Sequence, residues 1–510
     1  YNLQYPPGSI YDPRADLRLV CETAIAAGIV VCVAAGNSGQ YANEFDWRFG
    51  PPIDYRIPHN ISSPGDVPSV ITLGATDVND VISPISSIGP TTWSDVPEYG
   101  DYSYPSGLMK PDISAPGVGI ISTKRGGGYE QLTGTSMATP SASGSTALLL
   151  QVNPNLTPAQ IKYALEMSAI DLGASGKDGV YGSGRIDVNK ATKYVLEHYG
   201  GKIIQNLTIP SGETWTFYQG VTVTIQPSAS IIVNGTLNAN GTNASHITFD
   251  RIGSSGSWGG IVFNSGSSGS VEYCNIYHAT NGITCSYTLP MIRYNTISNN
   301  TTGISVYNIG TVSNEISYNT IQSNTYQGIY LSYASPKIYS NTISGNAYYG
   351  ISCRYYSSPY LYGNTITGHP SSALSCYYYS SARLVPWNAY GYYWGAGRNI
   401  IKNNTGNGIS AAYMSNLYLG SSPYGGHNSI CNNTGTELSA YYNCNIMAEI
   451  NYWGTPLNTS EFYAYQSTID YTPADTIDWN PDNQSIVRRP NGISNLSTTN
   501  SVKSDLDKAY

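Results

Sequence analysis

One short segment of the chain has the residue types that a nucleophilic hydroxyl needs. Residues 134–140 read Gly-Thr-Ser-Met-Ala-Thr-Pro, and residues 143–150 continue with small and then leucine-rich helical spacing, so Ser136 is predicted at the start of a helix. Backbone N–H groups at a helix N-terminus lack intrahelical partners and can stabilise the oxyanion that forms when a hydroxyl attacks a carbonyl. The alternative is that Ser136 only caps the helix, as serine often does.

A second segment could supply a further donor to such an oxyanion. Residues 30–39 form a continuous valine-rich run, which predicts a strand buried on both faces of a parallel sheet, and the run leads into Asn37 on a glycine-flanked turn. An asparagine amide at the carboxyl end of a strand can donate to a developing oxyanion. Between these segments, residues 110–117 read Lys-Pro-Asp-Ile-Ser-Ala-Pro-Gly.

The segments AAGNSG, KPDISAPG and GTSMATP, in that order, resemble the subtilisin-like serine peptidases, as do VITLGATD at residues 70–77 and YGSGRIDV at residues 181–188. The resemblance covers roughly residues 14–195 and implies an α/β parallel-sheet domain. It implies that Ser136 is the acylated nucleophile, that the Asn37 side chain and the Ser136 N–H form the oxyanion hole, and that Asp112 is structural. The substrate-binding residues that it implies are Ala34, Ala35, Gly36, Gly134 and Thr135. A structural calcium ion is compatible with the family, but no ligand set can be assigned.

The family also requires an aspartate, in Asp-Ser/Thr-Gly, and a histidine, in His-Gly-Thr, because serine is a weak nucleophile until an imidazole accepts its proton. Neither motif occurs in this sequence, and His59 follows the Asn37 segment where the family's histidine precedes it. We interpret His59 as a loop histidine. Because the chain begins with tyrosine, the simplest expectation is an N-terminally truncated peptidase domain that is inactive by itself.

Composition predicts a secreted or cell-surface protein that is rich in sheets and turns. Only 11% of the residues are charged, whereas glycine, with 53 residues, and tyrosine, with 46, are abundant. The net charge of −8 argues against nucleic acid as a partner, and no apolar run is long enough to span a membrane. Eight cysteines are too few for a disulfide scaffold; Cys21 and Cys32 are predicted to be buried thiols. No cysteine or histidine cluster suggests a metal site.

From residue 202 onward the sequence changes character: residues 202–250 alternate apolar and polar positions in short runs, and an internal repeat follows them. Asn-Thr-Ile recurs at Asn295, Asn319, Asn341 and Asn364, at spacings of 24, 22 and 23 residues, and Gly-Ile recurs with a similar period. This period predicts a solenoid in which each repeat is one coil of strands. Isoleucines would stack inside the solenoid, and asparagines would form hydrogen bonds along the stack.

The repeats resemble the right-handed parallel β-helix family over about residues 203–455, which places Cys353 and Cys376 on neighbouring coils. The expected organisation is therefore a partial peptidase domain at residues 1–200, an all-β parallel β-helix at residues 201–456, and a C-terminal extension and linker at residues 457–510. The repeat is expected to end after Trp453.

The β-helix could itself act on polysaccharides, but such enzymes need clustered carboxylates. Between Arg251 and Thr436 the only acidic residues are Glu272 and Glu315, which we interpret as structural. Abundant tyrosines could stack on sugar rings or could simply cover the outer sheet faces.

Three functions are therefore compatible with the sequence. The first, which we favour, is a secreted serine endopeptidase acting on polypeptides, with the β-helix as an accessory domain for binding or placement. The others are an inactive peptidase-like adhesin and a carbohydrate-binding or polysaccharide-active β-helix protein. The first is favoured because Ser136, Asn37 and the glycines around them are intact.

Overall fold

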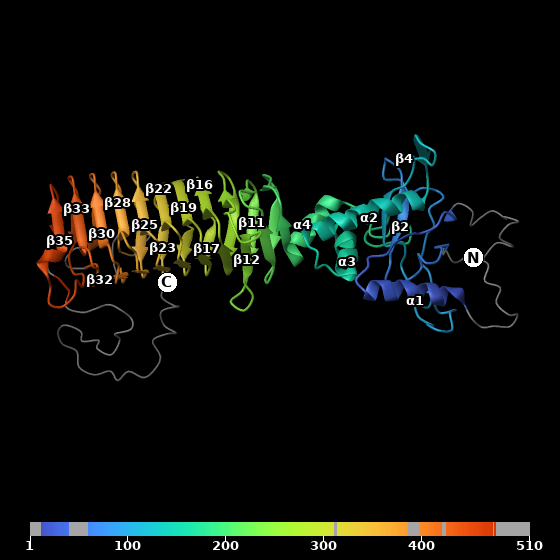
Figure 1. Ribbon diagram of the computed structural model, residues 1–510, viewed down its shortest axis with the longest axis horizontal. Helices are drawn as coiled ribbons and strands as arrows, with labels where there is room; N and C mark the ends of the chain where they lie inside the picture. The colour runs from blue at the N-terminus through green and yellow to red at the C-terminus, as the bar shows by residue number, and fades with distance from the viewer. Residues whose placement is uncertain are drawn as a thin grey trace, which may run out of the picture.

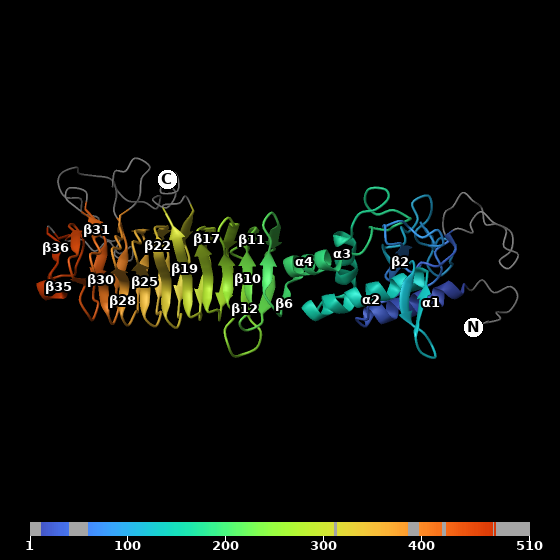
Figure 2. The ribbon, with the colours of Figure 1, turned by 90° about the horizontal axis from the view of Figure 1, so that it is seen from above.

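The computed structural model describes residues 12–39, 60–310, 314–385, 397–420, 425–472 and 474–475. The molecule is elongated, with an α/β unit at one end and a long stack of parallel strands making up the rest (Figure 1, Figure 2). This combination confirms the predicted fold class, a parallel-sheet domain followed by a parallel β-helix. His59 and most of the expected C-terminal extension lie outside the described residues.

The α/β unit is built on a parallel sheet in the order β1-β2-β3. Its strands and helices are β1 (Cys32–Ala34), β2 (Ile71–Thr76), β3 (Ile113–Pro116), α1 (Pro13–Ala26), α2 (Thr135–Val152), α3 (Pro158–Ser168) and α4 (Val188–Tyr199), and an antiparallel hairpin of β4 (Ile120–Thr123) and β5 (Tyr129–Leu132) precedes α2. Leu73 and Ile113 of the sheet share one core with Ala138 and Leu149 of α2. This shared hydrophobic core packs α2 against the sheet.

Strand β1 differs from the expectation of a strand buried on both faces. All three of its residues are only half-buried, and Cys21 and Cys32 are half-buried as well. Within the described residues β1 pairs only with β2, so one of its edges has no neighbouring strand. The apolar run alone could not distinguish a central strand from this edge strand.

Most coils of the β-helix contribute one parallel strand to each of three sides. The largest sheet has 11 described strands: β7 (Leu207–Ile209), β10 (Ser230–Val233), β13 (Gly260–Phe263), β16 (Asn281–Ser286), β19 (Thr302–Ile309), β22 (Gln327–Ala334), β25 (Tyr349–Arg354), β28 (Ser372–Tyr377), β30 (Asn407–Ala412), β33 (Leu438–Tyr441) and β35 (Phe462–Tyr465). The second has 10: β6 (Gly201–Ile203), β9 (Thr222–Ile225), β12 (Ile247–Arg251), β15 (Cys274–Tyr277), β18 (Thr296–Ser298), β21 (Thr320–Gln322), β24 (Thr342–Ser344), β27 (Thr365–Thr367), β29 (Ile400–Lys402) and β32 (Ser429–Cys431).

The third side of the coil is divided between two sheets. The first has seven described strands: β8 (Thr214–Phe217), β11 (Thr236–Asn240), β14 (Ser268–Glu272), β17 (Met291–Arg293), β20 (Glu315–Ser317), β23 (Lys337–Tyr339) and β26 (Tyr360–Tyr362). The second consists of β31 (Leu417–Gly420), β34 (Asn445–Ala448) and β36 (Thr468–Asp470).

Stacked isoleucines fill the interior of the β-helix, as the repeat predicted. Ile297, Ile321, Ile343 and Ile366 are paired in register on successive coils, and each is fully buried. Cys353 lies opposite Cys376 on the neighbouring coil, which confirms their predicted placement as interior residues of the stack.

Asparagines form a continuous ladder of hydrogen bonds along the bends. In this ladder the side-chain amide of each asparagine donates to the next Oδ1 at 2.8 to 3.0 Å. Its members are Asn295, Asn319, Asn341, Asn364, Asn399, Asn428 and Asn451. Buried polar groups are thereby paired within the stack instead of with water.

Replacing Asn364 with alanine is expected to lower the free energy of unfolding by about 2–4 kcal/mol, because each buried group left without a partner costs about 1–3 kcal/mol. The Asn364 Oδ1 accepts both the backbone N–H and the side-chain amide of Asn341, at 3.1 and 3.0 Å. Urea unfolding of the β-helix would measure the loss. The matched control is Asn243→Ala, since Asn243 is exposed and makes no hydrogen bond with a described residue; equal stability of the two variants would contradict the prediction.

The β-helix is closed at its first coil by α4. Leu196 of α4 belongs to the β-helix core, and the Glu197 carboxylate accepts the Thr216 N–H at 2.6 Å. At the other end, β35 and β36 continue the parallel stack to Asp470. The expected boundary at residue 456 therefore falls inside the β-helix, and the repeat does not end after Trp453. The last coil lacks the Asn-Thr-Ile sequence, so the repeat pattern could not reveal it.

Candidate active site

Ser136 lies in the first turn of α2, as the sequence predicts. Its side chain is exposed, and the N-cap of the helix is Gly134, so the alternative in which Ser136 caps α2 is wrong. Glycine at position 134 has a φ of 155°, and an added Cβ would approach the Asn37 amide nitrogen to 3.0 Å. Gly134 thus allows the Asn37 segment to approach the start of α2 closely. Because no side chain caps this helix, its first N–H groups remain available beside Ser136.

Asn37 lies beside this helix start, and the structure fixes the orientation of its amide. Its Oδ1 accepts the Thr135 N–H at 2.9 Å and the Thr135 hydroxyl at 3.0 Å. Since the oxygen is held, the two N–H groups on Nδ2 face away from these contacts, and no described residue accepts a hydrogen bond from them. The Ser136 N–H belongs to the first helical turn and also lacks an intrahelical acceptor. Two hydrogen-bond donors, the Asn37 side-chain amide and the Ser136 N–H, therefore lie next to the exposed Ser136 hydroxyl.

The residues predicted to bind substrate differ in how exposed they are to solvent. Thr135 and Ala35 are fully buried, whereas Ala34 and Gly36 are half-buried, and Gly134 is a buried glycine. The Thr135 hydroxyl accepts the Gly36 N–H at 3.2 Å while it donates to Asn37. The Thr135 side chain therefore joins the turn after β1 to the start of α2. Binding of substrate by Ala34, Ala35, Gly36, Gly134 and Thr135 stays a prediction.

Replacing Thr135 with valine is expected to lower kcat about tenfold with little change in KM, because the Asn37 amide loses one of the two bonds that orient it. Steady-state kinetics on a chromogenic peptide, with the complete protein, would measure this. Thr135→Ser keeps the hydroxyl and should restore kcat. Thr133→Val is the control, since Thr133 is exposed and bonds to Gly119 instead; an equal loss in this control would contradict a positioning role for Thr135.

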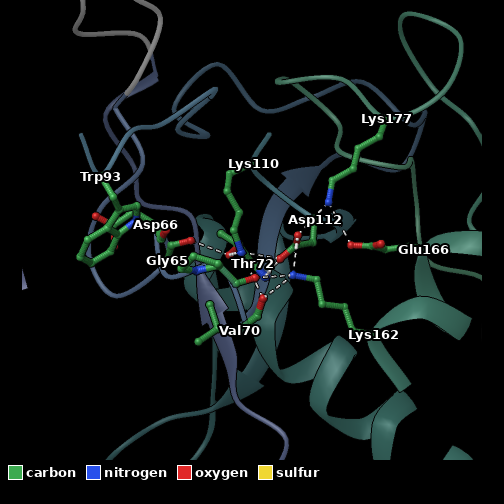
Figure 3. Close-up of polar contacts among 11 residues, drawn as sticks. Gly65, Asp66, Val70, Thr72, Trp93, Lys110, Asp112, Lys162, Glu166 and Lys177 are labelled. Atoms are coloured by element: carbon green, nitrogen blue, oxygen red, sulfur yellow. Dashed lines mark hydrogen bonds and ion pairs between the residues drawn. The ribbon is translucent and has the colours of Figure 1, made fainter. Parts of the chain in front are cut away.

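Next to the start of β3, three lysines converge on one buried carboxylate, as Figure 3 shows. Lys110 Nζ lies 2.7 Å from Asp112 Oδ2, and Lys162 and Lys177 lie 2.9 and 2.8 Å from Asp112 Oδ1. Lys110 also donates to Thr72 Oγ1 at 2.8 Å and to the Val70 carbonyl at 3.1 Å. Asp112 thereby ties β2, β3, α3 and the loop after α3 together, which agrees with the structural role that was expected of it.

The burial of this cluster changes its protonation equilibria. Burial lowers the pKa of Lys110 to about 7, although the Asp112 charge opposes the shift. Burial alone would raise the pKa of Asp112, but the charges of Lys110, Lys162 and Lys177 outweigh it and hold the pKa below its usual range. Asp112 is therefore the ionised anchor of the cluster.

The five described histidines all lie away from Ser136. His198 of α4 stacks between Tyr194 and Tyr218, with ring centroids 4.0 and 4.3 Å away, and the other four belong to the β-helix. The described residues therefore place no imidazole that could accept a proton from the Ser136 hydroxyl. They also contain no group of three or more His, Cys, Asp or Glu side chains that could hold a metal ion, so no calcium ligands are assigned.

Comparisons with known proteins agree with the two parts of the structure, the α/β unit and the parallel β-helix. A subtilase family model matches residues 8–184, and a model of the right-handed β-helix region matches residues 289–451. Serine protease AprX of Bacillus subtilis (strain 168) is 36% identical over 204 residues, which cover 36% of this chain and 39% of that protein.

Subtilisin NAT of Bacillus subtilis subsp. natto is 33% identical over 177 residues, covering 35% of this chain and 37% of that protein. Subtilisin BL of Lederbergia lenta is 33% identical over 181 residues, covering 36% of this chain and 52% of that protein. The chain thus spans between 37% and 52% of the length of these relatives. Residues 8–184 are thus similar to the subtilase family, and residues 289–451 are similar to the right-handed β-helix region.

Proposed function

We propose that this protein is a serine endopeptidase that hydrolyses polypeptides through an acyl-enzyme on Ser136. The observation that carries the proposal is the Asn37 amide, whose oxygen is held by Thr135 while its N–H groups remain available beside the exposed Ser136. The similarity of residues 8–184 to the subtilases supports the same reaction class.

In the proposed reaction, Ser136 Oγ attacks the carbonyl carbon of the scissile peptide bond and gives its proton to a general base. Asn37 Nδ2 and the Ser136 N–H donate hydrogen bonds to the resulting oxyanion. When the tetrahedral intermediate collapses, the C–N bond breaks and the leaving amine takes the proton from the base. Water then hydrolyses the acyl-enzyme and frees Ser136. The reaction requires a histidine from outside the described residues, since none of those described contacts Ser136.

The experiment that tests this proposal is labelling of the complete protein with a fluorophosphonate, which reacts with activated serines. We expect one adduct per chain, located on the peptide that contains Ser136, and loss of casein cleavage in proportion to labelling. Folded complete protein that neither reacts with the probe nor cleaves casein would contradict the proposal and favour an inactive, adhesive role.

We also propose that the protein acts outside the cell, at the surface or in the medium. The low charge of the chain supports this, as does a β-helix whose outer faces carry exposed tyrosines. No helix in the described ranges combines the length and apolar character that crossing a membrane requires. Immunoblotting of the culture medium, the cell surface and the lysate would test the location; protein found only in the lysate would contradict it.

A further inference from the structure

We propose that the outer face of the 11-stranded sheet binds an uncharged oligosaccharide in a groove across β25, β28, β30 and β33. The groove has a volume of about 370 Å³, within the range of about 300–1,000 Å³ that is usual for small-ligand sites. Ser375 and Ser410 form its floor, Tyr348 and Tyr349 lie on one side, and Tyr377 and Tyr441 lie on the other. The inference rests on the β-helix alone and stands whether or not Ser136 is catalytic.

The groove exists because two columns of tyrosines are interrupted. In one column, Tyr377 and Tyr441 lie on coils on either side of Ala412. Because neighbouring strands are about 4.8 Å apart, the alanine leaves about 9–10 Å between two tyrosine positions, enough for one flat ring. In the other column, Tyr349 is followed by Ser372 and then Asn407.

These interruptions leave aromatic faces open in an otherwise stacked array. Beside the groove, tyrosine rings cover each other: Tyr355 and Tyr378 stack with centroids 5.4 Å apart, and Tyr378 and Tyr413 with centroids 5.0 Å apart. Tyr413 also lines the groove, and its ring centroid lies 5.9 Å from that of Tyr377 in a tilted arrangement. Tyr348 stacks on Tyr326 at 5.3 Å and meets Tyr349 edge to face at 4.4 Å, whereas the next coil carries Ser371, whose N–H bonds to the Tyr348 carbonyl, in place of a further ring. A tyrosine face that no other ring covers can pack against the C–H face of a sugar ring.

The polar groups of the groove fit the hydroxyls of a sugar. The Ser375 hydroxyl is fully buried in the groove floor and makes no hydrogen bond with any described residue. Buried hydroxyls normally have partners, so Ser375, like Ser352 at the same register position on the preceding coil, retains hydrogen-bonding capacity for a water or a ligand. The side chains of Ser410 and Asn407 lie beside it on the same face. Aromatic walls above a hydroxyl and amide floor match a molecule with apolar faces and polar edges.

Charge favours a neutral sugar over a uronic acid or a sulfated chain. No lysine, arginine, aspartate or glutamate lines the groove. Arg354, which pairs in register with Tyr377, stacks with its guanidinium carbon 4.3 Å from the Tyr377 ring and 5.3 Å from the Tyr349 ring. The buried carboxylate of Glu437, just before β33, accepts the Asn433 N–H at 3.1 Å. Without paired carboxylates the groove has no means to cleave a glycosidic bond, so its role is binding.

Sheet geometry argues against an extended peptide as the occupant. A peptide that adds to a sheet bonds to free backbone groups at an edge, whereas β28 and β30 are interior strands that pair on both sides. The groove therefore offers side chains only. Hydroxyls and aromatic faces without an apolar side-chain pocket suit a glycan better than a peptide.

The test measures binding of the complete protein to cellohexaose, mannohexaose and chitohexaose by titration calorimetry, with hexagalacturonate as the charged comparison. We expect at least one neutral hexasaccharide to bind more tightly than hexagalacturonate. Tyr441→Ala should weaken this binding about tenfold. Tyr287→Ala is the matched control, because Tyr287 is 66% exposed and lies outside the groove; its binding should equal that of the wild type.

A second variant keeps the proposal testable if loss of a tyrosine disturbs folding. Ala412→Tyr restores the missing ring in the column, so it should fill the groove and abolish binding while circular dichroism shows an intact β-helix. No binding of any neutral hexasaccharide by the wild type would overturn the proposal, as would tighter binding of hexagalacturonate. Unchanged binding by both Tyr441→Ala and Ala412→Tyr would overturn this location. If the wild type bound casein and Ala412→Tyr abolished that binding, the groove would be a peptide-binding site and the oligosaccharide proposal would be wrong.

Discussion

Replacing Ser136 with alanine is expected to reduce kcat for casein cleavage by the complete protein about 10⁶-fold, a magnitude that rests on subtilisins. The reason is that the hydroxyl forms the covalent bond to the substrate, and no other group at the start of α2 can replace it. Asn37 and the Ser136 N–H remain in the variant, so a residual rate above that of water should persist. Because Ser136 is exposed and makes no side-chain hydrogen bond with a described residue, its removal should leave the free energy of unfolding within about 0.5 kcal/mol of the wild type.

The control for this prediction is Ser141→Ala, which removes an exposed serine hydroxyl from the same helix. It should cleave casein at the wild-type rate. If Ser136→Ala retained a substantial fraction of the wild-type activity, the nucleophile would be another residue, and the proposed function would lose its central group. Thermal unfolding of all three proteins separates loss of chemistry from loss of folding.

Replacing Asp112 with asparagine is expected to lower the free energy of unfolding of the subtilase domain by about 3–5 kcal/mol, the usual effect of removing one partner of a buried ion pair. The Asp112 side chain is 1% exposed and neutralises Lys110, which is 0% exposed, while it also pairs with Lys162 and Lys177. Without the carboxylate, three ammonium groups would remain close together with only Glu166, paired to Lys177 at 3.0 Å, as a countercharge.

Urea unfolding, followed by the fluorescence of the buried Trp93 in the same domain, measures this loss. The control is Glu130→Gln, which breaks the ion pair of Lys124 and Glu130 at 3.5 Å, where both side chains are about half exposed. Exposed pairs contribute about 0–1 kcal/mol. A loss in Asp112→Asn no larger than that in Glu130→Gln would show that the cluster does not anchor the domain.

The pH dependence of stability gives a second readout of Asp112. The folded state holds the pKa of this carboxyl below its ordinary value of 3.8. Its contribution to stability is therefore fully present above pH 3.8 and is lost as the pH falls below that value. The wild type should lose stability more steeply than Asp112→Asn in this acid range.

Much of this molecule could be predicted from local sequence. The start of α2 followed from small residues and helical spacing around Ser136. The β-helix followed from the repeated Asn-Thr-Ile, because each repeat forms one coil with its isoleucine inside and its asparagine at a bend. These features depend on residues close together in the chain, or on a regular spacing.

Only the tertiary structure decided what distant residues do to one another. Thr135 was expected to contact substrate, but folding brings it to Asn37, 98 residues earlier, where it is buried and orients the amide. Asp112 meets Lys162 and Lys177 because α3 and its following loop return to the sheet, and no spacing in the sequence indicates that approach. The asparagine ladder continues past Asn364 across a spacing of 35 residues, where the repeat length changes. The groove exists because Ala412 replaces a tyrosine at one register position, and register is set by pairing between coils, not by the residue itself.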